Sequence, residues 1–170
     1  METTTYYTQH ASPLGDLLLT SDGRALTRLY LPTGKTAATP QASWIRDDDA
    51  TPFVLAREEL DAYFAGTLER FTVPLAPAGG TAFDRRVWDA LLCIPYGKTT
   101  SYGELARAID APGAARAVGL SNGRNPIAIV VPCHRVIGAN GKLVGYGGGL
   151  PTKEKLLALE GAGKGQLALL

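Results

Sequence analysis

The stretch Pro132-Cys133-His134-Arg135 combines the side chains of this sequence that are best suited to nucleophilic chemistry. A cysteine attacks electrophiles as its thiolate, but an unperturbed thiol is only slightly ionised near neutral pH. His134 could take the proton of Cys133, directly or through a water, if an acidic side chain elsewhere held the imidazole in the right tautomer. Arg135 adds positive charge nearby. The motif therefore predicts an activated cysteine.

A cysteine beside a histidine also has a simpler interpretation, which is a thiol buried in the core. Neighbouring side chains on a strand point to opposite faces, so His134 need not reach Cys133. Cys93 is expected to be such an inert core thiol, on a helix expected over residues 83–94. The wide separation of the two cysteines matches no zinc-binding pattern and provides no disulfide framework. His10 has no partner cluster and is expected at a surface or a turn.

The composition is that of an ordinary globular protein. The chain has 170 residues and is 45% hydrophobic, so it can bury a core as one domain or as two small ones. Its longest apolar run, residues 127–131, is too short to cross a bilayer, and its start lacks the features of a signal peptide. Free thiols also suit a reducing compartment. These features predict a cytoplasmic location.

The charges divide the chain into two parts of opposite sign. The Pro- and Ala-rich stretch at residues 74–80 suggests a linker, so we take residues 1–80 and 81–170 as two domains. The first part holds 6 Lys+Arg and 10 Asp+Glu, which gives 6 − 10 = −4, and the second holds 11 and 6, which gives 11 − 6 = +5. The second part is therefore the one suited to a polyanionic partner.

Residues 1–80 predict a small antiparallel sheet with a helix. Segments rich in Thr, Tyr and Leu, separated by turn residues, are expected as strands at residues 3–8, 14–20 and 24–31, with a further strand at 71–75. Thr51 as N-cap and Pro52 in the first turn open a helix, which Gly66 ends.

Residues 81–170 are expected to be mainly helical. The helices are expected at residues 83–94, 102–109, 114–120 and 152–159. The first two begin with capping boxes, formed by Thr81 with Asp84 and by Ser101 with Glu104. The second and third, joined by a Gly-containing turn, have the outline of a helix-turn-helix, although two short helices can also simply pack on a core.

The third of these helices is unusual because small residues surround a single long cation, Arg116. A helix of this kind fills little core, but it allows its backbone to approach DNA closely. After it, residues 127–131 are expected as a buried strand or extended segment that Pro132 ends. Cys133 is thus expected to leave the core at a break in the chain.

The segment around the cysteine, Ile129 to Ile137, resembles the active-site signature of the O6-alkylguanine-DNA alkyltransferases, also called methylated-DNA–protein-cysteine methyltransferases. Further stretches agree with this family in order and spacing: Ile94-Pro95-Tyr96-Gly97 with Ser101-Tyr102, Ala114 to Gly119, Asn125-Pro126, Gly145 to Gly149 and Leu157 to Gly161. The resemblance covers residues 81–161 densely and residues 1–80 in outline.

The resemblance implies an α+β fold. Residues 1–80 would form a structural RNase H-like domain, and residues 81–170 a winged helix-turn-helix domain that binds DNA and carries the cysteine. It also implies irreversible transfer of the alkyl group of O6-alkylguanine in double-stranded DNA to Cys133, through minor-groove binding and base flipping. Each protein molecule would react once. The family also allows O4-alkylthymine as a substrate.

The resemblance further implies roles for individual residues. Cys133, His134 and Glu160 match a relay in which a water and the histidine activate the thiol. Tyr102 matches the tyrosine that assists flipping, and Arg116 matches the residue inserted in place of the flipped base. The flat surface for the groove would be formed by Ala114, Ala115, Ala117 and Gly119. The substrate pocket would be lined by Val136, Tyr146, Gly147 and Gly148, and the turn before the cysteine would be tied by Asn125.

Several expectations about ligands follow. With glycine at positions 147 and 148, the pocket is expected to admit bulky adducts. The reaction requires no metal or organic cofactor, and zinc is not expected because residues 1–80 hold no cysteine and only His10, whereas zinc-binding relatives use N-terminal Cys and His ligands. The expected partner is damaged double-stranded DNA, with no membrane and no obligatory protein partner. The family allows cooperative self-association on DNA.

Two other classes of protein remain open. A DNA-binding damage sensor without transfer activity would have the same helix-turn-helix. A Cys-His hydrolase would share the pair Cys133 and His134 but would turn over an acyl substrate. The sequence shows no second cluster of catalytic residue types, which argues against the hydrolase.

Overall fold

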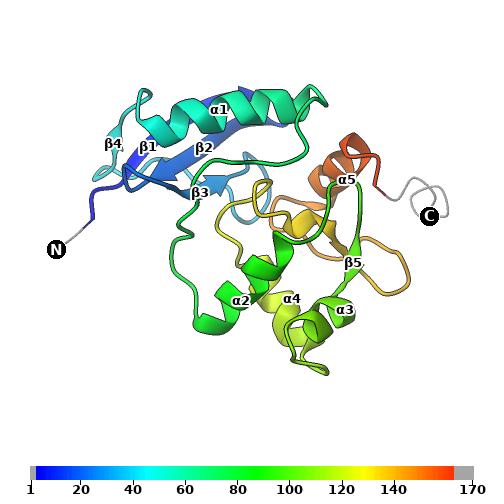
Figure 1. Cartoon of the computed structure of the whole chain (residues 1–170). Coiled ribbons are helices and arrows are strands. Elements are labelled where there is room, and N and C mark those ends of the chain that lie inside the picture. Colours follow the sequence, from blue (N-terminus) through cyan, green and yellow to red (C-terminus); the bar gives the residue numbers. More distant parts are fainter. Residues whose placement is uncertain (1–2, 163–170) are drawn as a thin grey trace. The chain divides into compact units, whose positions relative to one another are not determined.

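The computed structural model describes residues 3–162, which fold as an α+β protein of two compact units (Figure 1). Unit 1 comprises the described residues up to Gly79 together with Pro126–Ala128, and unit 2 comprises Gly80–Asn125 together with the described residues from Ile129. The α+β class predicted from the sequence is confirmed. No helix within residues 3–162 is long and apolar enough to cross a lipid bilayer.

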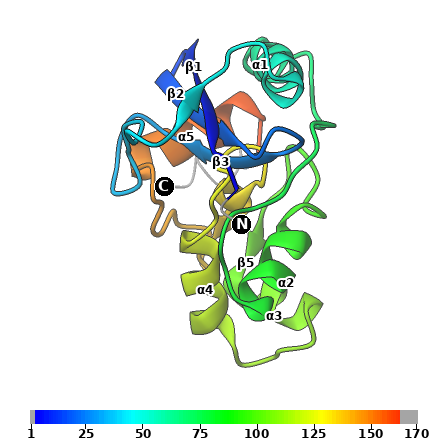
Figure 2. The same cartoon turned by 90° about the vertical axis from the view of Figure 1, so that its left-hand side faces the viewer.

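Within the described residues, unit 1 holds a four-stranded sheet. Its strands are β1 (Tyr6–Ser12), β2 (Gly15–Ser21), β3 (Leu26–Tyr30) and β4 (Ile45–Arg46), in the spatial order β3-β2-β1-β4. The first three form the predicted antiparallel meander, and β4 adds a parallel edge. Helix α1 (Thr51–Phe64) lies across one face of the sheet, where it buries Phe53, Ala56 and Leu60 completely (Figures 1 and 2).

The strand predicted at residues 71–75 does not form. Leu75 makes only an isolated bridge, whereas the backbone N–H groups of Thr72 and Val73 donate to the Glu59 carboxylate of α1 at 2.8–3.0 Å. Every buried backbone donor needs a partner, and here a buried side chain takes the donors that a strand ladder would use. The prediction was wrong because Glu59 looks like an ordinary surface residue in the sequence.

Two further details of unit 1 differ from the predictions. Thr51 is the first residue of α1 and not its N-cap, since Ala50 holds that position without a side-chain hydrogen bond. His10, expected at a surface or a turn, lies on β1 with its Nε2 atom 2.6 Å from Oδ1 of Asp61 on α1. The two residues are far apart in the sequence, so their pairing depends on how α1 packs on the sheet.

Unit 2 is mainly helical, as predicted. Its helices are α2 (Ala82–Leu91), α3 (Tyr102–Ala108), α4 (Ala115–Gly123) and α5 (Leu150–Leu159). The turn between α3 and α4 contains Gly113 at φ +88°, and both helices pack against each other and against α2 (Figure 2). A short parallel ladder joins β5 (Thr100–Ser101) to β6 (Val136–Ile137), which follows the 3₁₀ turn η1 (Cys133–Arg135).

The two predicted capping boxes differ in completeness. Thr81 and Asp84 form the full reciprocal box at the start of α2. At the start of α3, the Ser101 hydroxyl accepts a hydrogen bond from the Glu104 N–H, but the Glu104 carboxylate accepts from the Thr100 hydroxyl at 2.9 Å. The second box is therefore only half formed.

Cys93 is exposed to solvent, and the prediction of an inert core thiol was wrong. Helix α2 ends at Leu91, earlier than expected, and its buried face is formed by Val87, Trp88 and Leu91. Position 93 lies beyond the end of the helix and outside this buried stripe. The helical period therefore does not carry Cys93 into the core.

The buried segment before Cys133, expected as a strand or an extended segment, contains a turn. Ile127 forms an isolated bridge with Leu29, and residues 128–130 then form a turn. Ile129 in this turn has φ +73°, a strained conformation for a β-branched residue, and its side chain is 1% exposed. The strained residue is thus one whose side chain is buried.

Candidate active site

Cys133 opens the 3₁₀ turn η1 directly after Pro132. Its side chain is nearly buried, and those of His134 and Arg135 are buried as well. The sequence argument that neighbouring side chains alternate between faces applies to strands, and this segment is a tight helical turn. That objection to a cysteine–histidine pair therefore does not hold here.

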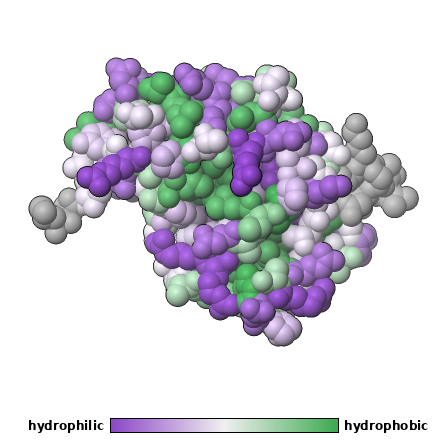
Figure 3. All heavy atoms as spheres, in the orientation of Figure 1, coloured by the Kyte–Doolittle hydropathy of each residue, from purple (hydrophilic) through white to green (hydrophobic). Residues whose placement is uncertain are grey.

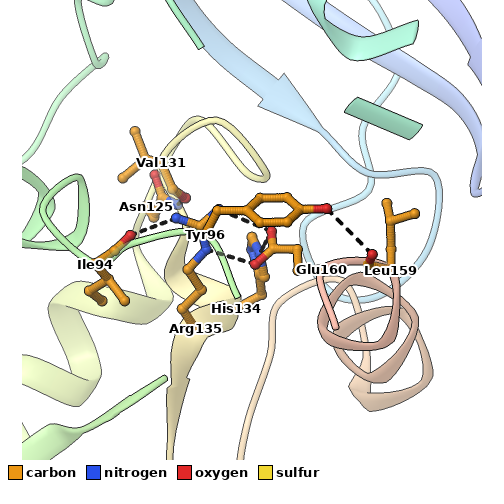
Figure 4. Close-up of polar contacts among 8 residues, drawn as sticks. All are labelled: Ile94, Tyr96, Asn125, Val131, His134, Arg135, Leu159 and Glu160. Atoms are coloured by element: carbon orange, nitrogen blue, oxygen red, sulfur yellow. Dashed lines mark hydrogen bonds and ion pairs between the residues drawn. The ribbon is translucent and has the colours of Figure 1, made fainter. Parts of the chain in front are cut away.

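Glu160 joins His134 and Arg135 in a buried polar cluster (Figure 4). Its Oε2 atom accepts a hydrogen bond from Nε2 of His134 at 2.7 Å, and its Oε1 atom accepts one from Nε of Arg135 at 2.8 Å. Arg135 also donates to the Ile94 carbonyl at 2.7 Å and lies over the ring of Tyr96. The structure thus places an acidic partner beside His134, at the C-terminal end of α5.

The ionisation of His134 is governed by its burial. Burial lowers the pKa of the His134 imidazole, and the nearby Glu160 carboxylate opposes this shift only in part. A neutral imidazole has one donor and one acceptor nitrogen, and Nε2 is the donor because it faces a carboxylate. Nδ1 is then a buried acceptor, and no group within residues 3–162 forms a hydrogen bond with it.

Cys133 is a neutral thiol at rest. Burial raises the pKa of its thiol, and a hydrogen bond from Asn125, the charge of Lys153 and a hydrogen bond from Tyr146 lower it by less. A neutral thiol is a poor nucleophile, so it must give up its proton when it reacts. The site therefore holds a protonated nucleophile together with a buried neutral base.

Two asparagines hold the backbone around the cysteine. Nδ2 of Asn125 donates to the Val131 carbonyl at 2.7 Å, which ties the two ends of the turn before Cys133. Nδ2 of Asn122, on α4, donates to the carbonyl of Cys133 itself at 3.4 Å. Asn125 was predicted to tie this turn, whereas no role was predicted for Asn122.

The loop before α5 brings the predicted pocket residues Tyr146, Gly147 and Gly148 into the same unit as Val136, which is fully buried on β6. The hydroxyl of Tyr102, the first residue of α3, donates to the Val144 carbonyl of this loop at 3.2 Å. Tyr102 is thus in contact with the loop that carries the pocket residues.

Lys153 is a residue of this site that sequence reasoning missed. It lies on α5 with its side chain fully buried, and its Nζ atom donates to the carbonyls of Val136 and Val144. The only signal in the sequence was its spacing of three and four residues from the apolar Leu156 and Leu157, which puts Lys153 on the buried face of the helix.

Apart from Tyr102 on α3, the predicted DNA-contact residues lie on α4 or, for Ala114, at its N-cap. Arg116, Ala117 and Leu120 are exposed, and the remaining small residues of this surface are half-buried, namely Ala114, Ala115 and Gly119. Within residues 3–162 no hydrogen bond or ion pair joins Arg116 to the buried cluster of Glu160. In the same range, no group of His, Cys, Asp and Glu side chains is arranged to hold a metal ion.

The fold and the site define a class of protein in which a buried cysteine with an adjacent base is carried by a domain with a helix-turn-helix. Residues 82–162 match the family profile described as the 6-O-methylguanine DNA methyltransferase DNA binding domain. Residues 5–77 match the ribonuclease-like domain of the same family. These matches confirm the predicted fold class, a small ribonuclease-like sheet domain followed by a mainly helical domain.

Individual relatives agree with these profiles. The methylated-DNA–protein-cysteine methyltransferase of Mycobacterium leprae is 55% identical over 149 residues, 88% of each chain. That of Methanosarcina acetivorans is 52% identical over 157 residues, 92% of this chain and 99% of the relative. The crystal structure of Mycobacterium tuberculosis OGT in complex with DNA matches with a TM-score of 0.84 and 54% identity, over 92% of each chain. The chain therefore belongs to the methylated-DNA–protein-cysteine methyltransferase family.

Proposed function

We propose that this protein repairs DNA by transferring the alkyl group of O6-alkylguanine to the Sγ atom of Cys133. The observation that carries the proposal is the state of His134, whose Nε2 is held by buried Glu160 while Nδ1 remains a buried acceptor without a partner in the described residues. Such an atom, on the residue that directly follows Cys133, is suited to receive the thiol proton through one bridging water. The relatives named for cysteine methylation from DNA support this assignment.

The chemistry follows from these ionisation states. The proton of the Cys133 thiol passes to Nδ1 of His134, and the resulting imidazolium is stabilised by the Glu160 carboxylate. The thiolate then attacks the alkyl carbon, so that an S–C bond forms as the C–O6 bond breaks. The departing guanine gains one proton and the imidazolium of His134 gives up the proton that it received, so that in sum a thiol and an O6-alkylguanine become a thioether and guanine.

The DNA is proposed to bind along α4 through its minor groove. The small side chains of this helix allow a close approach, and Arg116 extends from it to fill the space of a flipped guanine. Tyr102 lies next to Gly119 of the same helix, where it can crowd the phosphate of the flipped nucleotide. Hydrophilic side chains predominate around α3 at the bottom of Figure 3. The DNA complex of the Mycobacterium tuberculosis relative supports this partner.

The reaction is proposed to occur once for each protein molecule. A thioether is not cleaved under mild conditions, because a thiolate leaves poorly from an alkyl carbon. The transfer itself needs only the thiol, the base and the damaged nucleotide, so no cofactor is required. The alkylated protein is then the end product.

Intact-protein mass spectrometry tests the proposal. The protein is incubated with double-stranded DNA that carries O6-methylguanine, and one methyl group per protein should appear on Cys133. Cys133→Ser is the matched control, because it keeps the shape of the site and removes the nucleophile. Duplexes with O4-methylthymine, assayed in parallel, test the second substrate.

Three other outcomes would contradict the proposal, and the first two would identify a different class of protein. Binding of the damaged DNA without any gain of mass would show a damage sensor and would exclude the transferase. A burst followed by a steady rate with an activated ester would show a hydrolase. Transfer to the exposed Cys93 in place of Cys133 would also contradict the proposal.

A further inference from the structure

Unit 1 contains a cavity of about 480 Å³ that is lined by residues of this unit. Helix α1 covers one face of the sheet (Figure 1), and Arg57 of α1 donates a hydrogen bond to the hydroxyl of Thr8, so Thr8 and its cross-strand partner Leu19 face the helix. Because side chains alternate along a strand, Thr20 and its partner Arg28 face the other side, where they line the cavity. The cavity therefore lies on the face of the sheet opposite α1, and its volume is typical of sites for small molecules.

Hydroxyl groups form much of the cavity wall. They belong to Thr3, Thr4, Thr5, Thr20, Ser21 and Thr27. The Oγ1 atoms of Thr20 and Thr27 lie 2.7 Å apart, and whichever hydroxyl accepts this hydrogen bond keeps its own proton as a donor. Within residues 3–162 neither hydroxyl forms a second hydrogen bond. The wall is thus suited to a polar ligand.

Arg28 gives the cavity a cation without an acidic partner. Its guanidinium lies 5.9 Å from the centre of the Tyr30 ring, and in the described part of the chain it forms no ion pair. A guanidinium has five N–H donors and binds a carboxylate or a phosphate through two parallel hydrogen bonds. A ligand with an anionic group would satisfy these donors.

Two aromatic rings form a flat surface beside this cation. The rings of Tyr30 and Trp44 are stacked, with their centres 6.4 Å apart and an angle of 24° between their planes. Both side chains are half-buried and line the cavity. Nucleobases stack favourably on aromatic side chains, because every base has a π face. The cavity therefore combines a surface for a planar ring with a site for an anion.

Asp22 places a negative charge elsewhere on the wall. Its Oδ1 atom accepts hydrogen bonds from the N–H groups of Ala25 and Arg24, which hold the pKa of this carboxyl below its ordinary value. Its Oδ2 atom has no hydrogen-bond partner among residues 3–162, so it can accept from an N–H or O–H donor of a ligand. A simple anion would be repelled by Asp22, whereas a ligand that carries both donors and an anion matches Asp22 and Arg28 together.

We propose that this cavity binds a nucleotide, with its base against Trp44 and Tyr30 and its phosphate on Arg28. A nucleotide carries a planar ring, hydrogen-bond donors and an anion within one small molecule, and the donors of its base or ribose pair with Asp22. The site belongs to unit 1 and Cys133 to unit 2, so the proposal does not rest on alkyl transfer. A free mononucleotide and a nucleotide within a single strand of nucleic acid offer the same chemistry.

Trp44 provides a direct probe of binding. It is one of two tryptophans, and the other, Trp88, is only 3% exposed. GMP, AMP and ribose 5-phosphate are titrated into the full chain, with tryptophan fluorescence and calorimetry as readouts. We expect GMP or AMP to quench the fluorescence with a dissociation constant below about 1 mM. Ribose 5-phosphate, which lacks the base, should bind at least about tenfold more weakly.

Three variants locate the ligand. Trp44→Phe keeps an aromatic ring, so calorimetric binding should remain while most of the quenching disappears. Arg28→Gln should weaken binding by about tenfold or more, because it removes the cation for the phosphate. Arg70→Gln, the matched control, replaces an exposed arginine of unit 1 that does not line the cavity, and it should bind as the unsubstituted protein does. Circular dichroism and thermal unfolding verify that all three variants are folded.

The proposal is overturned if neither GMP nor AMP binds at millimolar concentration, or if Arg28→Gln binds them as tightly as Arg70→Gln. A short single-stranded oligonucleotide, titrated in parallel, distinguishes the two sources of the ligand. Binding of the oligonucleotide that is tighter than that of GMP and weakened by Arg28→Gln assigns the site to single strands, and weaker binding assigns it to free nucleotides. No alkylated substrate enters these assays, so nucleotide binding and the proposed function of Cys133 stand or fail separately.

Discussion

Nε2 of His134 and Oε2 of Glu160 lie 2.7 Å apart, and both side chains are completely buried. Glu160 is also bound by Arg135, so its carboxylate already has a cationic partner before the histidine is protonated. The histidine can therefore remain neutral at rest and still become an imidazolium during a reaction, with a carboxylate in place to stabilise it. The geometry of His134 and Glu160 therefore supports the proposed transfer of a proton from Cys133 to His134.

Glu160→Gln should slow alkyl transfer while leaving DNA binding intact. The amide keeps the shape of the side chain but removes the charge that would stabilise the imidazolium of His134. We expect the single-turnover rate with O6-methylguanine DNA to fall by about 100-fold, within the range for loss of general-base assistance. Affinity for the same DNA, measured with the Cys133→Ser background, should change little. Unaltered transfer would show that Glu160 only packs beside the histidine.

The acid side of the pH profile should reflect the depressed pKa of His134. Because burial lowers the pKa of the imidazole below its ordinary value of 6.5, the base stays neutral down to a more acidic pH than a free histidine. The rate of transfer should thus be nearly level just below neutrality and decline only at lower pH. The same shift favours the folded state above the unfolded pKa and is lost as the pH falls, which equilibrium unfolding can measure. If the rate falls with a midpoint above pH 6.5, the assignment of a neutral His134 imidazole at rest is contradicted.

Arg116→Ala should affect only substrates in DNA. Arg116 lies on the exposed side of α4, and within residues 3–162 no hydrogen bond or ion pair joins it to the buried cluster of Glu160, so the free base should not need it. We expect transfer from a duplex to slow by about tenfold or more, because the flipped state loses the side chain that fills the gap. Reaction with free O6-benzylguanine should stay within about twofold. An equal loss of rate with both substrates would contradict the role of Arg116 in base flipping.

Gly147→Ser should narrow the range of adducts that react. The loop of Gly147 and Gly148 precedes α5 and belongs to the same unit as the cysteine, and an added side chain there reduces the space for a large alkyl group. We expect the rate with benzyl adducts to fall by about tenfold while the rate with methyl adducts changes little. If the benzyl rate is no lower in the serine variant, the proposal of a wide pocket must be abandoned.

Asp84→Asn should destabilise unit 2 without altering the active cysteine. The buried Asp84 carboxylate accepts hydrogen bonds from the Ser121 hydroxyl at 2.6 Å and the Thr81 N–H at 3.0 Å, and these hold its pKa below the ordinary value. We expect a loss on the order of 2 kcal/mol in the free energy of unfolding at neutral pH. The difference should disappear as the pH falls through the folded pKa, because protonation then removes the same charge. Asp89→Asn, on the exposed side of α2, is the control.

Local signals in the sequence predicted most of the helices and strands of this protein, but they predicted less well the residues at which these helices end. Capping residues such as Thr81 and Asp84 act within one turn of chain, and the structure confirms their box. The ends of α2 and α4 were misplaced, because the last turn of a helix depends on what packs against it. The strand expected at residues 71–75 failed for a related reason, since Glu59 of α1 takes its backbone donors.

The sequence by itself indicated the class of chemistry through the family resemblance of residues 81–161, because the adjacent pair Cys133 and His134 is also compatible with a thiol buried in the core. It could not determine the ionisation of these groups, since a pKa depends on burial and on partners that are distant in the chain. Only the tertiary structure brought Glu160 to His134, left Nδ1 as an acceptor and placed Lys153 among three carbonyls. Desolvation and hydrogen-bond geometry arise from packing, and packing joins residues that no local pattern connects.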